Sequence, residues 1–81
     1  MSEAKWIRFD YQPPKPGQKT SWWKVLPKEG GDALGIIKWF PAWRKYTFFP
    51  AFETTYEATC LRDIASFIEQ KTKEHKDGLR A

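Results

Sequence analysis

Residues 34–50 read LGIIKWFPAWRKYTFFP. Branched and aromatic side chains fill the runs on either side of Pro41-Ala42, and such side chains are typical of strands. Pro50 closes the second run, because proline has no backbone donor for a ladder. The pattern predicts a β-hairpin with strands at 34–40 and 43–49. With a two-residue loop, the predicted pairs are Phe40 with Trp43, Trp39 with Arg44, Lys38 with Lys45, Ile37 with Tyr46, and Ile36 with Thr47.

The segment before the hairpin supplies another strand. Residues 22–26, WWKVL, are rich in β-formers and end at Pro27, and EGGD at residues 29–32 is a turn signal. Strands this short, joined by turns this tight, favour an antiparallel meander. Upstream, residues 1–21 have the character of an irregular arm. Alternation of Ile7, Phe9 and Tyr11 suggests a short edge strand within it, which the proline-rich residues 13–17 end.

A helix follows the sheet. Thr54 and Glu57 have the spacing of a capping box, in which a hydroxyl and a carboxylate satisfy free backbone donors at the start of a helix. Apolar positions then recur every three or four residues, and Gly78 marks the predicted end. The stripe consists of Leu61, Ile64, Ala65 and Ile68, widened by Cys60 and Phe67.

These elements predict an α+β fold, a three-stranded antiparallel meander packed against one C-terminal amphipathic helix. The expected organisation is an N-terminal arm at 1–21, a β-β-β-α domain at 22–77 and a tail at 78–81. The 81 residues suffice for one domain, since a second core would have too few residues to fill it. The apolar stripe of the helix must cover one sheet face, because nothing else is available for it to pack on.

Alternation along the strands assigns each side chain to one face of the sheet. We expect the helix to cover the face formed by Ile37, Trp39, Tyr46 and Phe48, with Trp23 and Val25. Arg44 would lie at its margin, against the ring of Trp39. On the other face Lys38 lies opposite Lys45, an unfavourable pair that an anionic partner would relieve. The candidate binding residues on and beside this second face are Trp22, Lys24, Lys38, Phe40, Trp43, Arg44 and Lys45.

The charge distribution supports a binding role for that face. The chain has a net charge of +4. Residues 22–49 hold five Lys and Arg against two acidic residues, whereas residues 53–77 hold four against six, so the positive excess belongs to the sheet. The alternative needs no partner: a loop one residue longer exchanges the faces, and lysines on an open face often serve only solubility.

The sequence predicts no catalytic, metal or cofactor site. Cys60 and His75 are the only residues of their kinds, so neither a disulfide nor a zinc ligand set can form within the chain. Cys60 falls on the apolar stripe as a small hydrophobe, and we expect His75 to be solvated in a polar helix tail. Gly30-Gly31 precedes a strand, so it is a turn and not a phosphate loop. No apolar run has the length of a membrane span, and the N-terminus lacks the apolar stretch of a signal peptide, so we expect a cytoplasmic protein.

Two strings resemble a group of small phage and prophage proteins. They are LGIIKWFPAWRKYTFFP at 34–50 and CLRDIASF at 60–67, which occur in this order within a similarity that covers about residues 22–76. The resemblance implies a phage origin and action inside a bacterium, and it carries no functional residues with it. Three strands followed by one helix are also similar in architecture to AP2-type and integrase-arm DNA-binding domains, whose exposed sheet enters the major groove.

Two hypotheses on function follow. In the first, Lys24, Lys38, Arg44 and Lys45 meet phosphates, while Trp43 and Phe40 contact sugars or bases. DNA is the favoured nucleic acid, and Lys15 and Lys19 of the arm would add to the grip. In the second, the chain is a phage factor that binds a bacterial host protein and inhibits or redirects it, for example a CRISPR nuclease or a restriction enzyme. Neither hypothesis involves a membrane, and both leave the oligomeric state open.

Overall fold

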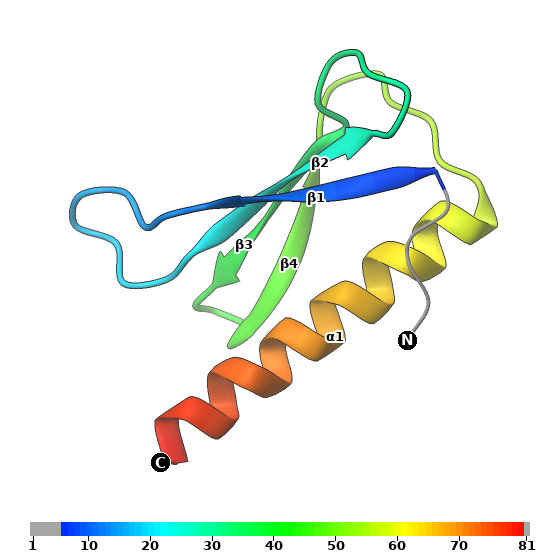
Figure 1. The fold of residues 1–81 in the computed structure, drawn as a ribbon. Coiled ribbons are helices and arrows are strands. Elements are labelled where there is room, and N and C mark those ends of the chain that lie inside the picture. The colour runs from blue at the N-terminus through cyan, green and yellow to red at the C-terminus, as the bar shows by residue number, and fades with distance from the viewer. Residues whose placement is uncertain (1–5, 81) are drawn as a thin grey trace.

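The computed structural model describes residues 6–80, which form one sheet and one helix (Figure 1). The strands are β1 (Ile7–Gln12), β2 (Trp22–Pro27), β3 (Gly35–Phe40) and β4 (Lys45–Pro50), and the helix is α1 (Ala58–Arg80). All neighbouring strands are antiparallel, in the order β1-β2-β3-β4. The predicted α+β class, meander and C-terminal helix are confirmed.

The sheet has four strands, because the short edge strand suggested within the arm forms beside the predicted three-stranded meander. β1 pairs with β2 over six residues, from Ile7 opposite Pro27 to Gln12 opposite Trp22. Its alternating apolar residues face the helix, and Ile7 is only 1% exposed. The segment expected to be an arm therefore contributes a full edge strand to the core, and residues 13–17 end it as predicted.

The β3–β4 register differs from the predicted one by two residues. Phe40 pairs with Lys45, and Lys38 lies opposite Thr47 instead of Lys45. A two-residue hairpin turn requires a positive φ at its first position, which the ring of Pro41 forbids. The loop therefore takes four residues, in which Trp43 and Arg44 donate backbone hydrogen bonds to the Phe40 carbonyl and Arg44 adopts a φ of 53°.

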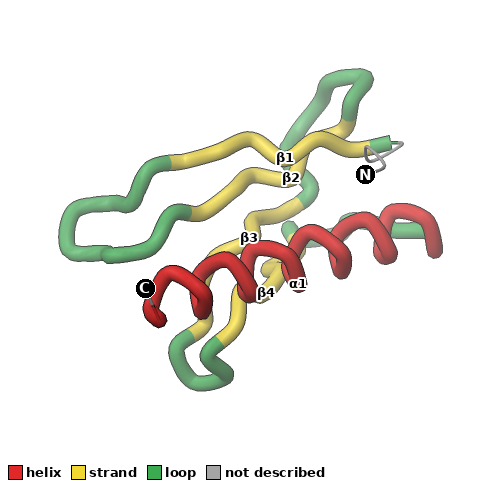
Figure 2. The backbone as a smooth tube through the Cα atoms, turned by 60° about the horizontal axis from the view of Figure 1, so that its bottom comes forward, coloured by secondary structure: helices red, strands yellow, loops and turns green. Residues whose placement is uncertain are grey.

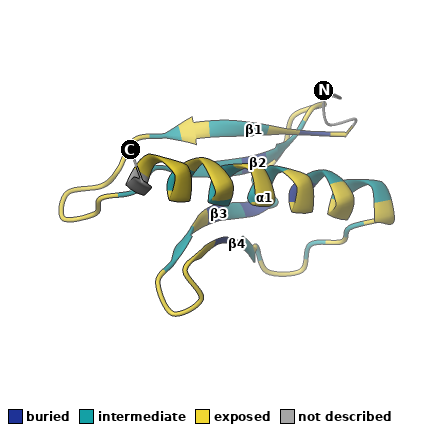
Figure 3. Cartoon of the chain, turned by 90° about the horizontal axis from the view of Figure 1, so that it is seen from below, coloured by how far each residue is buried: buried dark blue, intermediate teal, exposed yellow. Residues whose placement is uncertain are grey.

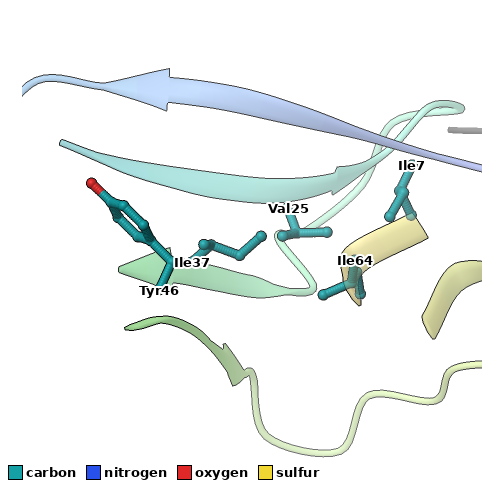
Figure 4. Packing of buried hydrophobic residues seen from close by; sticks show 5 residues of the cluster. All are labelled: Ile7, Val25, Ile37, Tyr46 and Ile64. Atoms are coloured by element: carbon teal, nitrogen blue, oxygen red, sulfur yellow. The ribbon is translucent and has the colours of Figure 1, made fainter. Parts of the chain in front are cut away.

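A shift by two residues leaves every side chain on its predicted face, because side chains alternate with a period of two. The helix lies across one face of the sheet, as Figures 2 and 3 show. The buried core between the two layers consists of Ile7, Val25, Ile37, Tyr46 and Ile64 (Figure 4). The prediction that the helix covers the Ile37 and Trp39 side is correct.

The helix is rotated from its predicted orientation. Leu61 is 51% exposed and Ala65 is exposed, so neither belongs to the buried stripe. Phe67 decides the rotation: its ring stacks on Phe9 at 4.0 Å between centroids and meets the edge of Trp23 at 5.3 Å. These contacts draw the side of the helix that carries Cys60, Ile64, Phe67 and Ile68 onto the sheet.

The helix boundaries also differ from those predicted. Thr54 does not cap the helix, because its hydroxyl lies 3.0 Å from the Ala51 carbonyl and 2.7 Å from the Tyr56 hydroxyl within the preceding loop. Glu57 is the N-cap, and its carboxylate accepts a 2.7 Å hydrogen bond from the backbone N–H of Cys60. The helix passes through Gly78, the predicted end, and continues to Arg80, the last residue that the structure describes.

The cap makes the stability of the first helical turn depend on pH. Hydrogen bonds from the backbone N–H groups of Thr59 and Cys60 hold the pKa of Glu57 below its ordinary value. A depressed carboxylate pKa stabilises the fold above the unfolded-state pKa, and this contribution disappears as the pH falls through the folded-state pKa. We expect Glu57→Ala to lower the urea midpoint at about pH 7 and the deficit to vanish once the pH falls below the lowered pKa of Glu57. A deficit that persists unchanged in acid would contradict capping by the carboxylate.

Candidate functional site

The sheet face opposite the helix is the candidate site, and it is called the open face below. Its members follow from the pairing registers and the alternation of side chains. They are Arg8, Asp10, Gln12, Trp22, Lys24, Leu26, Ile36, Lys38, Phe40, Lys45, Thr47 and Phe49. Asp10 is the single acidic residue among these twelve positions, and its carboxylate accepts a hydrogen bond from Gln12. The open face is therefore basic and partly aromatic.

Five of the seven predicted binding residues lie on the open face itself. They are Trp22, Lys24, Lys38, Phe40 and Lys45. Trp43 and Arg44 occupy the β3–β4 loop, where both are exposed. Trp43 is 65% exposed, and its ring meets that of Phe40 edge to face at 4.9 Å. The loop therefore extends the aromatic surface of the open face at its tip.

Two predictions around this site, the position of Arg44 and the exposure of His75, are wrong. Arg44 is not the strand partner of Trp39, because Tyr46 takes that position and Arg44 lies in the longer β3–β4 loop. The ring of Trp39 instead lies 4.2 Å from the ring of His75, which also meets Tyr46 at 6.2 Å. His75 is consequently half-buried and not solvated as predicted. The reason is the length of the helix, whose later turns still lie along β4.

Phe49 belongs to the site but was not predicted. It stands two residues beyond Thr47 on the same strand face, so extending the alternation by one step would have found it. Its ring lies 6.1 Å from that of Phe40, and the Lys38 ammonium sits 4.8 Å from its centroid. The open face thus carries a row of three rings, Trp43, Phe40 and Phe49, with a lysine over the last.

Trp22 forms a second aromatic site across the sheet, next to the β1–β2 loop. The indole of Trp22 donates a 3.1 Å hydrogen bond to the Pro13 carbonyl, and the Lys15 ammonium lies 4.8 Å from the ring. Each of these two aromatic sites therefore has an ammonium group placed over it. An ammonium over a half-exposed ring remains free to move to an anion, because such a contact is worth only about 0.5–1 kcal/mol at the surface.

Charge is unequal between the two ends of the sheet. The β1–β2 and β3–β4 loops lie at one end, and they carry Lys15, Lys19 and Arg44 without any acidic residue. The β2–β3 loop lies at the other end and carries Glu29 and Asp32 together with one lysine, Lys28. The positive potential is therefore concentrated where the rings of Phe40 and Trp43 are exposed.

Residues 6–80 give little support for a metal site, a reactive cysteine or a membrane-spanning helix. This part of the chain holds no group of three or more His, Cys, Asp or Glu side chains that could bind a metal ion. Burial, together with the Glu57 carboxylate, raises the pKa of the Cys60 thiol, which disfavours the reactive thiolate. None of the helical residues described forms a stretch long and apolar enough to cross a membrane.

Comparisons with known proteins place the chain among phage proteins. No protein-family profile matches it, and no solved structure matches it. Over 61 residues it is 41% identical to the "Uncharacterized 9.3 kDa protein" of Acholeplasma phage L2, a region that covers 75% of this chain and 78% of that protein. A match of this extent agrees with the phage resemblance of the two sequence strings. The chain therefore belongs to the family of small phage proteins that includes the 9.3 kDa protein of phage L2.

Proposed function

We propose that this protein is a non-enzymatic module that binds nucleic acid, with DNA the favoured form, in the cytoplasm of a bacterial host. One observation carries the proposal: a sheet face without a helical cover combines basic side chains with half-exposed rings. Lys24, Lys38 and Lys45 would meet phosphates, as would Arg44 from the loop. Phe40 and Trp43 would contact sugars or bases.

Folding alone gives no reason for this combination. A domain of this size has few apolar side chains to spare, yet Phe40, Phe49 and Trp22 are only half-buried on a face that the helix does not reach. Lysines spaced along such a face repel one another weakly and raise the local potential. Phosphates would relieve that repulsion and draw Lys15 and Lys38 away from the rings that they cover, which frees the rings to stack.

Binding to a bacterial host protein is the second candidate, and one observation favours it. Phe52 is 91% exposed in the segment between β4 and α1, on the far side of the positively charged loops. Exposed aromatic side chains are frequent anchors of protein interfaces. A phage factor that inhibits or redirects a host enzyme, such as a nuclease, would use this side of the molecule, and Phe52→Asp would then abolish its complex without changing nucleic-acid affinity.

A salt titration tests the proposed function. We expect the affinity for a fluorescently labelled oligonucleotide to fall by about a hundredfold between roughly 50 and 200 mM salt, because about four phosphate contacts release their counterions on binding. Fluorescence anisotropy measures this directly. An affinity independent of salt over the same range would contradict binding through the basic side chains of the open face.

A further inference from the structure

The four strands form two hairpins that separate toward the positively charged end. β1 pairs with β2 over six residues, and so does β3 with β4, but β2 pairs with β3 over three only, from Val25–Gly35 to Trp23–Ile37. Beyond this point the two hairpins diverge, and their loops extend in different directions (Figures 1 and 2). The residues after Ile37 in β3 consequently lack the β2 neighbour that a continuous sheet would give them.

Tyr46 bridges the two hairpins at the point where they diverge. Continuing the β2–β3 register would place Ser21 opposite Trp39, but the Ser21 carbonyl accepts a 3.2 Å hydrogen bond from the Tyr46 hydroxyl. The ring of Tyr46 lies between those of Trp23 and Trp39, at 5.4 Å from each and edge to face. The divergence is therefore supported by a packed and hydrogen-bonded side chain.

A cleft occupies the space between the diverging hairpins. Its volume of about 730 Å³ lies within the range of small-ligand sites. Lys19 and Thr20 line one wall, and Lys38, Trp39, Phe40 and Phe49 line the other. None of the described residues that line it is acidic. The cleft thus combines the faces of several rings with two ammonium groups and joins the open face.

We infer that the occupant of this cleft is single-stranded nucleic acid, an inference that rests on the proposed function and narrows its substrate class. Unpaired bases enter the cleft and stack on Phe40 and Phe49, and the adjoining phosphates meet Lys19 and Lys38. A duplex presents only the edges of its bases, since their faces are stacked on one another. Rings recessed between two hairpins are accessible to a base plane only when that base is unpaired.

The competing occupants fit the lining less well. An acidic peptide would satisfy the lysines but would leave the rings without a planar partner. An apolar peptide would leave Lys19 and Lys38 at the rim of a dry contact, where unpaired charges are costly. Stacking on aromatic rings together with a basic rim is the combination that single-strand binders share.

Three oligonucleotides of about 12 nucleotides test the inference on the full chain: oligothymidylate, a duplex of the same length, and an abasic strand with the same phosphates. We expect oligothymidylate to bind about tenfold or more tightly than the other two, because each stacked base contributes about 1–3 kcal/mol, or five- to more than a hundredfold. Phe49→Leu should weaken oligothymidylate binding about tenfold and leave duplex binding unchanged. Phe52→Leu is the matched control and should change neither.

The outcomes separate this inference from the proposed function. A duplex or abasic strand that binds as tightly as oligothymidylate overturns the inference, while salt-dependent binding of any of them retains the proposed function. Absence of binding to all three at low salt overturns both. The comparison of oligothymidylate with the abasic strand uses the unaltered protein, so it decides the question even if Phe49→Leu impairs folding.

Discussion

Reversal of two charges on the open face, Lys38→Glu with Lys45→Glu, is expected to abolish nucleic-acid binding. Each change replaces an attraction of about 1 kcal/mol by a repulsion of similar size, so the pair costs about 4 kcal/mol, or roughly a thousandfold in affinity. Both side chains are exposed on the same sheet face, Lys38 opposite Thr47 and Lys45 opposite Phe40. Folding should be little affected, which circular dichroism can verify before anisotropy titrations are made.

A matched control separates the position of the charges from their number. Lys28→Glu with Arg62→Glu changes the net charge by the same amount, but Lys28 lies in the β2–β3 loop and Arg62 on the helix, both exposed. We expect this variant to keep most of the affinity, since long-range attraction is screened beyond about 8 Å at physiological salt. Equal losses in the two variants would indicate attraction by net charge alone. Unchanged affinity in the Lys38 and Lys45 variant would reject the open face as the interface.

Ile37→Ala is expected to have the largest effect on stability, a loss of about 2–5 kcal/mol in the free energy of unfolding. Ile37 is fully buried on the third of four strands, where it packs in one cluster with Val25, Tyr46 and Ile64. A domain of this size has little stability in reserve, so the variant should be partly unfolded at room temperature. Urea denaturation followed by tryptophan fluorescence measures the change.

The neighbouring residue supplies the control for this prediction. Ile36→Ala removes the same atoms from the same strand, but its side chain lies half-buried on the open face. We expect it to cost only about 1 kcal/mol, because little apolar surface returns to water. Equal losses at positions 36 and 37 would contradict a sheet with one covered and one open face.

Alternation along the hairpin predicted the faces of the sheet more reliably than its register. The loop after Phe40 has four residues and not two, yet the helix still covers Ile37 and leaves Lys38 outside. An error of two residues in the register leaves each strand side chain on the same face of the sheet, whereas an error of one residue would have exchanged the faces. The property of Pro41 that lengthens the loop, its fixed φ, was present in the sequence. That fixed φ excludes the two-residue turn and, with it, the direct pairing of Lys38 with Lys45.

The rotation of the helix was not predictable from its own periodicity. Cys60, Leu61, Ile64 and Phe67 form overlapping apolar stripes, and the sequence alone ranks none of them first. The choice depends on the rings that the sheet offers, since Phe67 stacks on Phe9 of β1 and leaves Leu61 exposed. The alternation in β1 was not sufficient to predict a full strand, because a six-residue edge strand forms only where a neighbouring strand and a helix bury its apolar side.

Local patterns in the sequence therefore determined the strands, the helix and the two faces of the sheet, because alternation and helical spacing depend on neighbours a few residues apart. Only the tertiary structure decided where the hairpins diverge and which rings line the space between them. That arrangement depends on Tyr46 reaching the Ser21 carbonyl across 25 positions of the chain. A contact between such distant residues forms only when several strands and the helix have packed together, so no local pattern contains it.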